Sequence, residues 1–86
     1  MQVHHFDESG HGIFMRTYRG LGVNRDSTVL ASASEMHFAD GLVRPFIGNA
    51  FVQVVSIAPQ DNGNVDVKIH VDWNTDLPYR VSLAVV

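Results

Sequence analysis

The sequence predicts a small all-β domain, and three features of the chain carry this prediction. First, apolar and polar residues alternate without interruption from Val65 to Trp73, which is typical of a strand with one buried face. Second, turn-forming pairs such as Asp40-Gly41 and Gly48-Asn49 recur at short intervals, as in a sandwich or a barrel. Third, 86 residues leave room for only one hydrophobic core. We therefore expect a single β-rich domain over residues 1–86.

The individual elements follow from the alternation and from the turn signals between apolar runs. We expect about six or seven short strands, mostly antiparallel, in a sandwich or barrel-like meander. They are expected at residues 2–6, 12–19, 28–38, 42–47, 50–58, 65–73 and 79–86. The segment 27–39 has a second interpretation, because Val29, Leu30, Ala33 and Met36 also fit the apolar stripe of a helix. In that case the fold is α+β, with one helix packed on the sheet.

Pro59 selects the register of the hairpin that turns at Asn62-Gly63. A two-residue turn would place Pro59 at a hydrogen-bonded position, where proline has no N–H to donate. A three-residue loop with a glycine bulge instead places Pro59 opposite Val65, at a non-hydrogen-bonded position. This register joins apolar side chains across the hairpin, as a buried face requires. The expected pairs are Ile57 with Val67, Val55 with Ile69, and Phe51 with Trp73.

Two strands predict a surface for self-association. The hairpin register leaves Val52 and Val54 on a second face, so the strand 50–58 is apolar on both faces. In the last strand, Ala84 and Val86 make the other face only partly polar, and an unprotected apolar edge strand favours pairing with another chain. A small core without cysteines would also gain stability from a partner subunit. We therefore expect a homo-oligomer with these four valine and alanine residues at its interface.

The loop 73–79 is the candidate ligand-binding segment. Trp73 and Tyr79 provide aromatic faces that stack on apolar faces of a ligand, and Asn74 and Asp76 provide short polar side chains for its hydroxyls. This combination is typical of a shallow site for a carbohydrate or another small molecule. The alternative is that both aromatic residues belong to the core and that Asn74 and Asp76 only form the turn.

Two groups of histidine and carboxylate residues have the chemistry of a metal or catalytic site, but not the spacing. The first comprises His4, His5, Asp7, Glu8 and His11. On a strand His4 and His5 point to opposite faces, so they cannot both bind one ion without a bend. The second comprises Glu35, His37, Asp40, His70, Asp72 and Asp76. Nothing in the sequence brings these together, so we expect no metal, no cofactor and no catalytic residue, with a small enzyme or metal-binding protein as the alternative.

Charge and hydropathy exclude further classes of function. The net charge is −3, and the six Lys and Arg residues form no basic run, which disfavours a nucleic-acid partner. No apolar run approaches the length of a membrane span, and the N-terminal residues do not resemble a signal peptide. We expect no membrane partner and a cytoplasmic location. The remaining class is a non-catalytic, self-associating binding or assembly module, with a carbohydrate- or small-ligand-binding module as the alternative.

Overall fold

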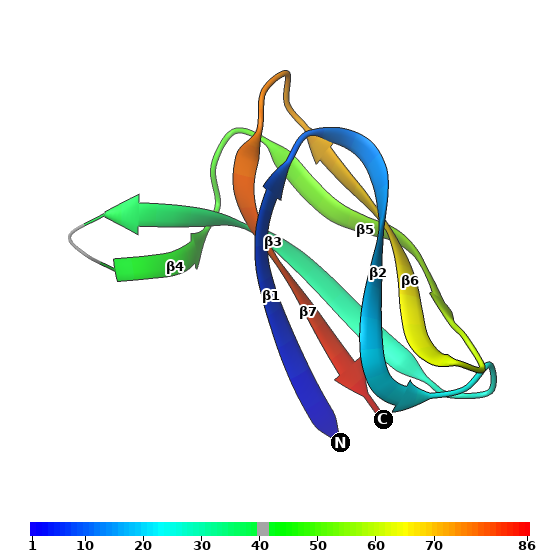
Figure 1. Ribbon diagram of the computed structural model, residues 1–86. Coiled ribbons are helices and arrows are strands. Elements are labelled where there is room, and N and C mark those ends of the chain that lie inside the picture. The colour runs from blue at the N-terminus through cyan, green and yellow to red at the C-terminus, as the bar shows by residue number, and fades with distance from the viewer. Residues whose placement is uncertain (40–41) are drawn as a thin grey trace.

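The computed structural model describes residues 1–39 and 42–86, with side chains described outside 38–43. In these residues the chain forms seven strands and no helix (Figure 1), which confirms the all-β prediction and the strand interpretation of 27–39. The strands are β1 (Gln2–Gly10), β2 (Gly12–Val23), β3 (Val29–Ala39), β4 (Leu42–Phe46), β5 (Phe51–Pro59), β6 (Gly63–Asp72) and β7 (Leu77–Val85). The described residues contain no helix that is long and apolar enough to cross a membrane.

The strands form two antiparallel sheets that face each other. Their orders are β1-β7-β3-β4 and β2-β6-β5, and we call them the four-stranded and the three-stranded sheet. The chain passes from the first sheet to the second between β1 and β2, where only His11 separates the two strands. Gly12 follows at a φ of 76°, a conformation that glycine adopts without steric cost. This corner places the edge strands β1 and β2 on the same side of the sandwich (Figure 1).

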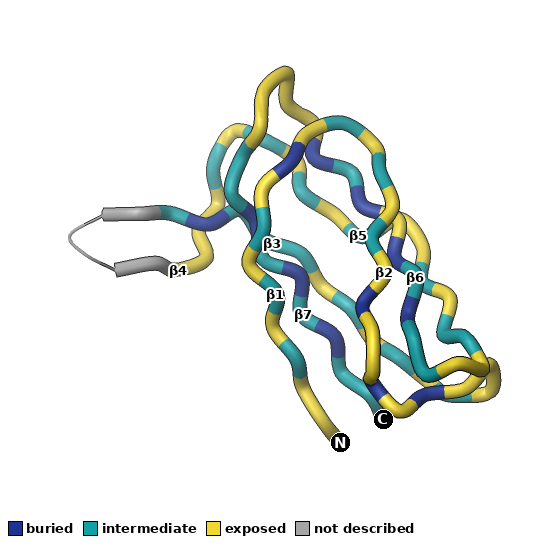
Figure 2. The backbone as a smooth tube through the Cα atoms, viewed as in Figure 1, coloured by how far each residue is buried: buried dark blue, intermediate teal, exposed yellow. Residues whose placement is uncertain are grey.

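The core lies between the inner faces of the sheets, and β6 and β7 supply its centre. In the middle of these two strands every second residue is fully buried, namely Val65, Val67, Ile69, Val71, Tyr79, Val81 and Leu83. Figure 2 shows buried positions along β6 and β7. Each of these strands has a neighbour on both sides, so its inward side chains are covered. The alternation from residue 65 to 71 is therefore confirmed, whereas the expectation that the C-terminal strand is an edge strand is wrong, because β7 lies between β1 and β3.

The β5–β6 hairpin has the turn that Pro59 predicts. The N–H of Gln60 donates to the carbonyl of Asn64 across a three-residue loop at 2.8 Å, and Gly63 has a φ of 88°, as a glycine bulge requires. Pro59 lies opposite Val65 and Ile57 lies opposite Val67. The register next to the turn is therefore confirmed.

Further from the turn the predicted register is wrong, because β5 carries a bulge at Val55. The register shifts between Val54 and Ser56, so Val54 faces Ile69 and Phe51 faces Asp72. A bulge inserts one extra residue and exchanges the faces of the residues beyond it. Val52 and Val54 therefore point inward and pack against the core, whereas Phe51 and Val55 are exposed. The strand is therefore apolar on both faces as expected, but the residues are exchanged: Val52 and Val54 lie on the inner face, and Phe51 and Val55 lie on the outer face.

The end of β3 and the whole of β4 project from the body as a two-stranded arm (Figure 1). We define the arm as residues 36–39 and 42–46. β3 pairs with β7 from Val29 to Glu35 and with β4 from Glu35 to Ala39, so the two pairings meet at Glu35. The radius of gyration is 13.2 Å, compared with about 12 Å for a compact chain of this length, which agrees with the projecting arm.

Candidate functional site

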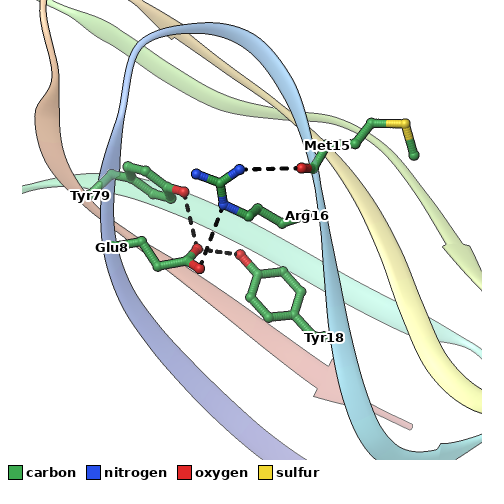
Figure 3. A network of polar contacts seen from close by, with 5 residues as sticks. All are labelled: Glu8, Met15, Arg16, Tyr18 and Tyr79. Carbon is green, nitrogen blue, oxygen red and sulfur yellow. Dashed lines mark hydrogen bonds and ion pairs between the residues drawn. The ribbon is translucent and has the colours of Figure 1, made fainter.

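A polar cluster links the two sheets on the side where β1 and β2 lie (Figure 3). Strand alternation puts Glu8 on the inner face of β1, directly opposite Tyr79 of β7. Arg16 and Tyr18 project from the inner face of β2. The hydroxyls of Tyr18 and Tyr79 both donate to Oε1 of Glu8, at 2.6 and 3.0 Å, and Nε of Arg16 lies 3.8 Å from Oε2. One carboxylate thus connects three side chains from both sheets.

Aromatic rings hold the members of this cluster in place. The ring of Phe6 stacks on Tyr18 with a centroid distance of 4.2 Å, and the guanidinium carbon of Arg16 lies 4.6 Å from the centroid of the Phe14 ring. Such contacts restrict the side-chain rotamers and stabilise the guanidinium over an aromatic face. The cluster therefore fixes the position of β1 relative to β2, two strands that no backbone ladder joins among the described residues.

The two phenols of the cluster are hydrogen-bond donors and not bases. Burial, followed by the negative charge of Glu8, raises the pKa of Tyr79 to about 12. Burial and the hydrogen bond to Glu8 also raise the pKa of Tyr18 well above its ordinary value. Both phenols therefore stay protonated near neutral pH, where an effective general base would need a pKa close to 7. The chemistry of the cluster is that of a link between sheets.

The four residues predicted to bind a ligand in the loop 73–79 do not share one environment. Trp73 follows β6 with 42% of its surface exposed, and Asn74 and Asp76 are also exposed. Tyr79 is fully buried and directs its hydroxyl to Glu8. The alternative interpretation, in which both aromatic residues belong to the core, is therefore confirmed for Tyr79 and wrong for Trp73. Ligand binding by the exposed part of the loop stays a prediction.

The N-terminal histidines and carboxylates are distributed over separate contacts. The ring of His4 packs on the inner side with its centroid 6.4 Å from that of Phe6, whereas His5 shares a 2.7 Å hydrogen bond with Oγ of Ser82. Asp7 accepts two hydrogen bonds from Arg80, which lower the pKa of its carboxyl group. His11 pairs with Asp76 at 2.5 Å. The described residues contain no group of three that could hold a metal ion.

The second histidine and carboxylate group is also divided. Glu35 and His37 lie two residues apart on one face of β3, whereas His70 projects from the outer face of the three-stranded sheet, 3.4 Å from the amide of Gln53. Asp72 lies at the exposed end of β6, and Asp40 lies outside the described residues. These histidines therefore belong to different surfaces of the molecule, and a shared catalytic centre would need them on one.

Four apolar side chains gather on the outer face of the four-stranded sheet, next to both chain ends. Val3, Ala84 and Leu30 form one row across β1, β7 and β3, and Val86 follows Ala84 by two residues. We call this set the terminal patch. Val3, Leu30 and Val86 are 53%, 59% and 68% exposed. A shallow groove of about 260 Å³ runs between Val3 and Leu30 over the small side chains of Ala84 and Ser82.

No family model, curated protein or solved structure matches this chain. The candidate sites are therefore compared by their geometry alone. The polar cluster lies between the sheets and only Arg16 reaches well into solvent, with 40% of its side chain exposed. The outer face of the three-stranded sheet also exposes Ile13 and Met15 on β2 and Phe51 and Val55 on β5, but Lys68 and His70 of the central strand β6 separate the two pairs. The terminal patch is the more continuous apolar surface.

The sequence analysis singles out two of the four residues of this patch. Ala84 and Val86 were expected at an interface, but Val3 and Leu30 were not. Their signal is the alternation itself, because Val3 and Leu30 occupy outward positions where a polar residue is expected. The polar cluster was missed for the complementary reason: Glu8 and Arg16 occupy inward positions, and only the cross-strand register shows that they meet.

Proposed function

We propose that this chain is a non-catalytic assembly module and that its terminal patch packs against the same patch of a second copy. The observation that supports this most is the row of exposed apolar side chains across three adjacent strands, which includes no charged residue. Contiguous exposed apolar surface is a feature of protein interaction sites, whereas apolar residues scattered singly over a surface are normal. The proposal keeps the cytoplasmic location expected from the sequence, and nothing else in it depends on that location.

The shape of the molecule supports a second copy as the occupant. The two larger dimensions of the whole molecule, with the arm included, are 39 and 25 Å, so an interface with the ~800 Å² per partner of a standard complex would take up most of one broad face. Two sheets that pack face to face in this way form a common β arrangement. A two-fold axis would bring each row of Val3, Ala84 and Leu30 onto its symmetry mate, and self-complementary packing is the usual form of a homodimer.

The polar residues beside the patch also suit this arrangement. His5 and Ser82 follow the apolar row on the same face, and the ion pair of Asp7 with Arg80 comes next, with Nε and Oδ1 2.6 Å apart. An apolar centre bordered by satisfied polar groups is the usual anatomy of a protein interface.

A negative charge placed in the terminal patch tests whether the chain self-associates through it. Light scattering over a range of protein concentrations should give a mass that rises above the 9.5 kDa of one chain, and Leu30→Asp should shift the transition to at least about tenfold higher concentration, because it would bury an unpaired carboxylate in the contact. Ile13→Asp is the matched control, since Ile13 is 62% exposed on the other sheet. A wild-type protein that stays monomeric, or equal effects of the two substitutions, would contradict the proposal.

A further inference from the structure

A pocket of about 220 Å³ opens at the base of the arm, between β3 and the connection from β4 to β5. Glu35 lies on its inner side and is directly opposite Phe46 in the register of the two strands. Phe51, at the start of β5, forms part of the other wall. None of these residues belongs to the terminal patch, so the pocket is a separate feature of the surface.

The carboxylate of Glu35 lacks a partner for one of its oxygens. Oε2 is buried and accepts no hydrogen bond from the described residues. None of the ion pairs among the described residues involves Glu35. Their basic partners are Arg16, Arg25, Arg80 and His11. A buried acceptor without a donor is rare in folded proteins, and it calls for an explanation such as a bound group.

Gly48 shows that the carboxylate and an aromatic ring converge on the same point. A β-carbon on Gly48 would overlap Oε2 of Glu35 and would lie 3.1 Å from Cε2 of Phe46. The backbone of Gly48 is not in a left-handed conformation, so a larger residue there would only require the Glu35 carboxylate and the Phe46 ring to shift. Oε2 of Glu35 and the edge of the Phe46 ring therefore lie close together, and one small group can contact both of them.

The remaining walls are mainly apolar, with Ser34 as a polar exception, and match the stem of a ligand. Phe46 and Phe51 border the opening, with 37% and 74% of their surfaces exposed. The small side chain of Ala50 also lines the pocket. His37 packs against Phe46 with ring centroids 5.0 Å apart, which holds that ring in position. A carboxylate beside apolar aromatic rings suits an organic cation on an alkyl stem, because the carboxylate accepts a charged hydrogen bond and the rings pack against the stem.

We propose that this pocket binds a primary ammonium or guanidinium group carried on a short alkyl stem, with Glu35 as the anionic acceptor and Phe46 and Phe51 as the apolar and aromatic walls. The group can be part of a free amine or of a basic side chain in a peptide, since the two share this chemistry. The site is independent of the terminal patch and does not rest on self-association.

The test is a titration of the ¹⁵N-labelled protein with n-butylammonium and n-butylguanidinium, followed by amide chemical shifts. Saturable shifts should appear at Ser34, Gly48 and Ala50, and 1-butanol, which has the same alkyl stem without the charge, should give none. Glu35→Gln should weaken cation binding by about tenfold or more, because it removes the charge of the acceptor. Asp26→Asn is the matched control, since it removes the same charge from an exposed turn and should leave binding unchanged.

The other outcomes are equally decisive. Equal binding by the wild type and Glu35→Gln, equal shifts with 1-butanol, or no saturable shift would overturn the proposal, and the comparison with 1-butanol needs only the wild-type protein. Binding that appears only after Arg44→Gln would also overturn it, because the arginine of the same chain would then fill the pocket. Blocked Gly-Lys-Gly and Gly-Arg-Gly peptides separate the two sources: tighter binding than n-butylammonium indicates a protein partner, and equal binding indicates a free amine.

Discussion

At the scale of single residues, Glu8 couples two tyrosines, because one of its oxygens accepts hydrogen bonds from both. Hydrogen bonds to a charged group contribute about 1.5–3 kcal/mol each, and loss of the shared acceptor leaves two buried hydroxyls without a partner. Arg16 adds less, since its side chain is 40% exposed and Nε lies 3.8 Å from the carboxylate, and solvent weakens such pairs. The stability of this cluster therefore depends mainly on the two phenols and on Glu8.

Tyr79 makes the folded protein sensitive to alkaline pH. Its pKa is raised from 10.0 to about 12 in the folded state, so its contribution to the free energy of unfolding is complete below pH 10 and is lost as the pH rises to about 12. We expect this residue to account for a decrease of about 2–3 kcal/mol over that range, and Tyr18 acts in the same direction. Urea denaturation at several alkaline pH values measures the slope.

The variant Tyr79→Phe separates this effect from general alkaline unfolding. It should lower stability near neutral pH by about 1.5–3 kcal/mol and should also make the alkaline decrease shallower. Thr17→Val is a suitable control, because it removes an exposed hydroxyl that donates to Asp66 and leaves the titrating phenols in place. An unchanged alkaline slope in Tyr79→Phe would show that Tyr79 does not titrate as the structure requires.

At the scale of elements, the sequence was informative where one principle acted alone. Pro59 has no N–H, so its position fixed the turn and the two nearest cross-strand pairs. The alternation of β6 and β7 identified the buried residues of both strands. The bulge at Val55 was not predictable, because Val54 and Val55 are adjacent apolar residues and either can face inward. Which one does so depends on the packing of Val52 and Val54 against the core, and that packing is a property of the folded sandwich.

The candidate sites show the same difference between what the sequence predicts and what only the structure shows. The exposed positions of Asn74 and Asp76 follow from turn chemistry, whereas the inward position of Glu35 and its meeting with Phe46 depend on a register that only the structure provides. Likewise, alternation predicts Tyr79 as a core residue, but its hydrogen bond to Glu8 joins residues that lie far apart in the chain. Long-range pairing therefore accounts for most of what the sequence did not predict.

The bulge gives a direct test of the register in β5. Val54→Asp should destabilise the fold by about 3 kcal/mol or more, because it places a carboxylate against Ile69 in the core. Val55→Asp should change stability by less than about 1 kcal/mol, since Val55 is exposed. The regular register predicted from Pro59 would give the opposite order. Urea denaturation of the two variants therefore decides between them, and each serves as the control for the other.

At the scale of the whole molecule, the two ends of the chain form one strand pair. Gln2 lies opposite Val85 in the ladder between β1 and β7, and both ends lie at the same end of the sandwich (Figure 1). β1 also contributes Glu8, which joins the sheets. Folding must therefore close a loop of nearly the full chain length before β1 is fixed, and contacts of such long sequence separation slow folding.

Joining these ends should accelerate folding. A circular permutant with about four Gly and Ser residues between Val86 and Met1, opened in the exposed turn at Asn74, replaces that long loop by a short one and lowers the closure cost by about 2 kcal/mol. If β1 pairs with β7 in the transition state, stopped-flow refolding should be about tenfold faster. The unpermuted chain with the same linker appended to Val86 is the control. An unchanged refolding rate with slower unfolding would instead show that β1 joins the sheet after the transition state, which would make the Glu8 cluster a late step in folding.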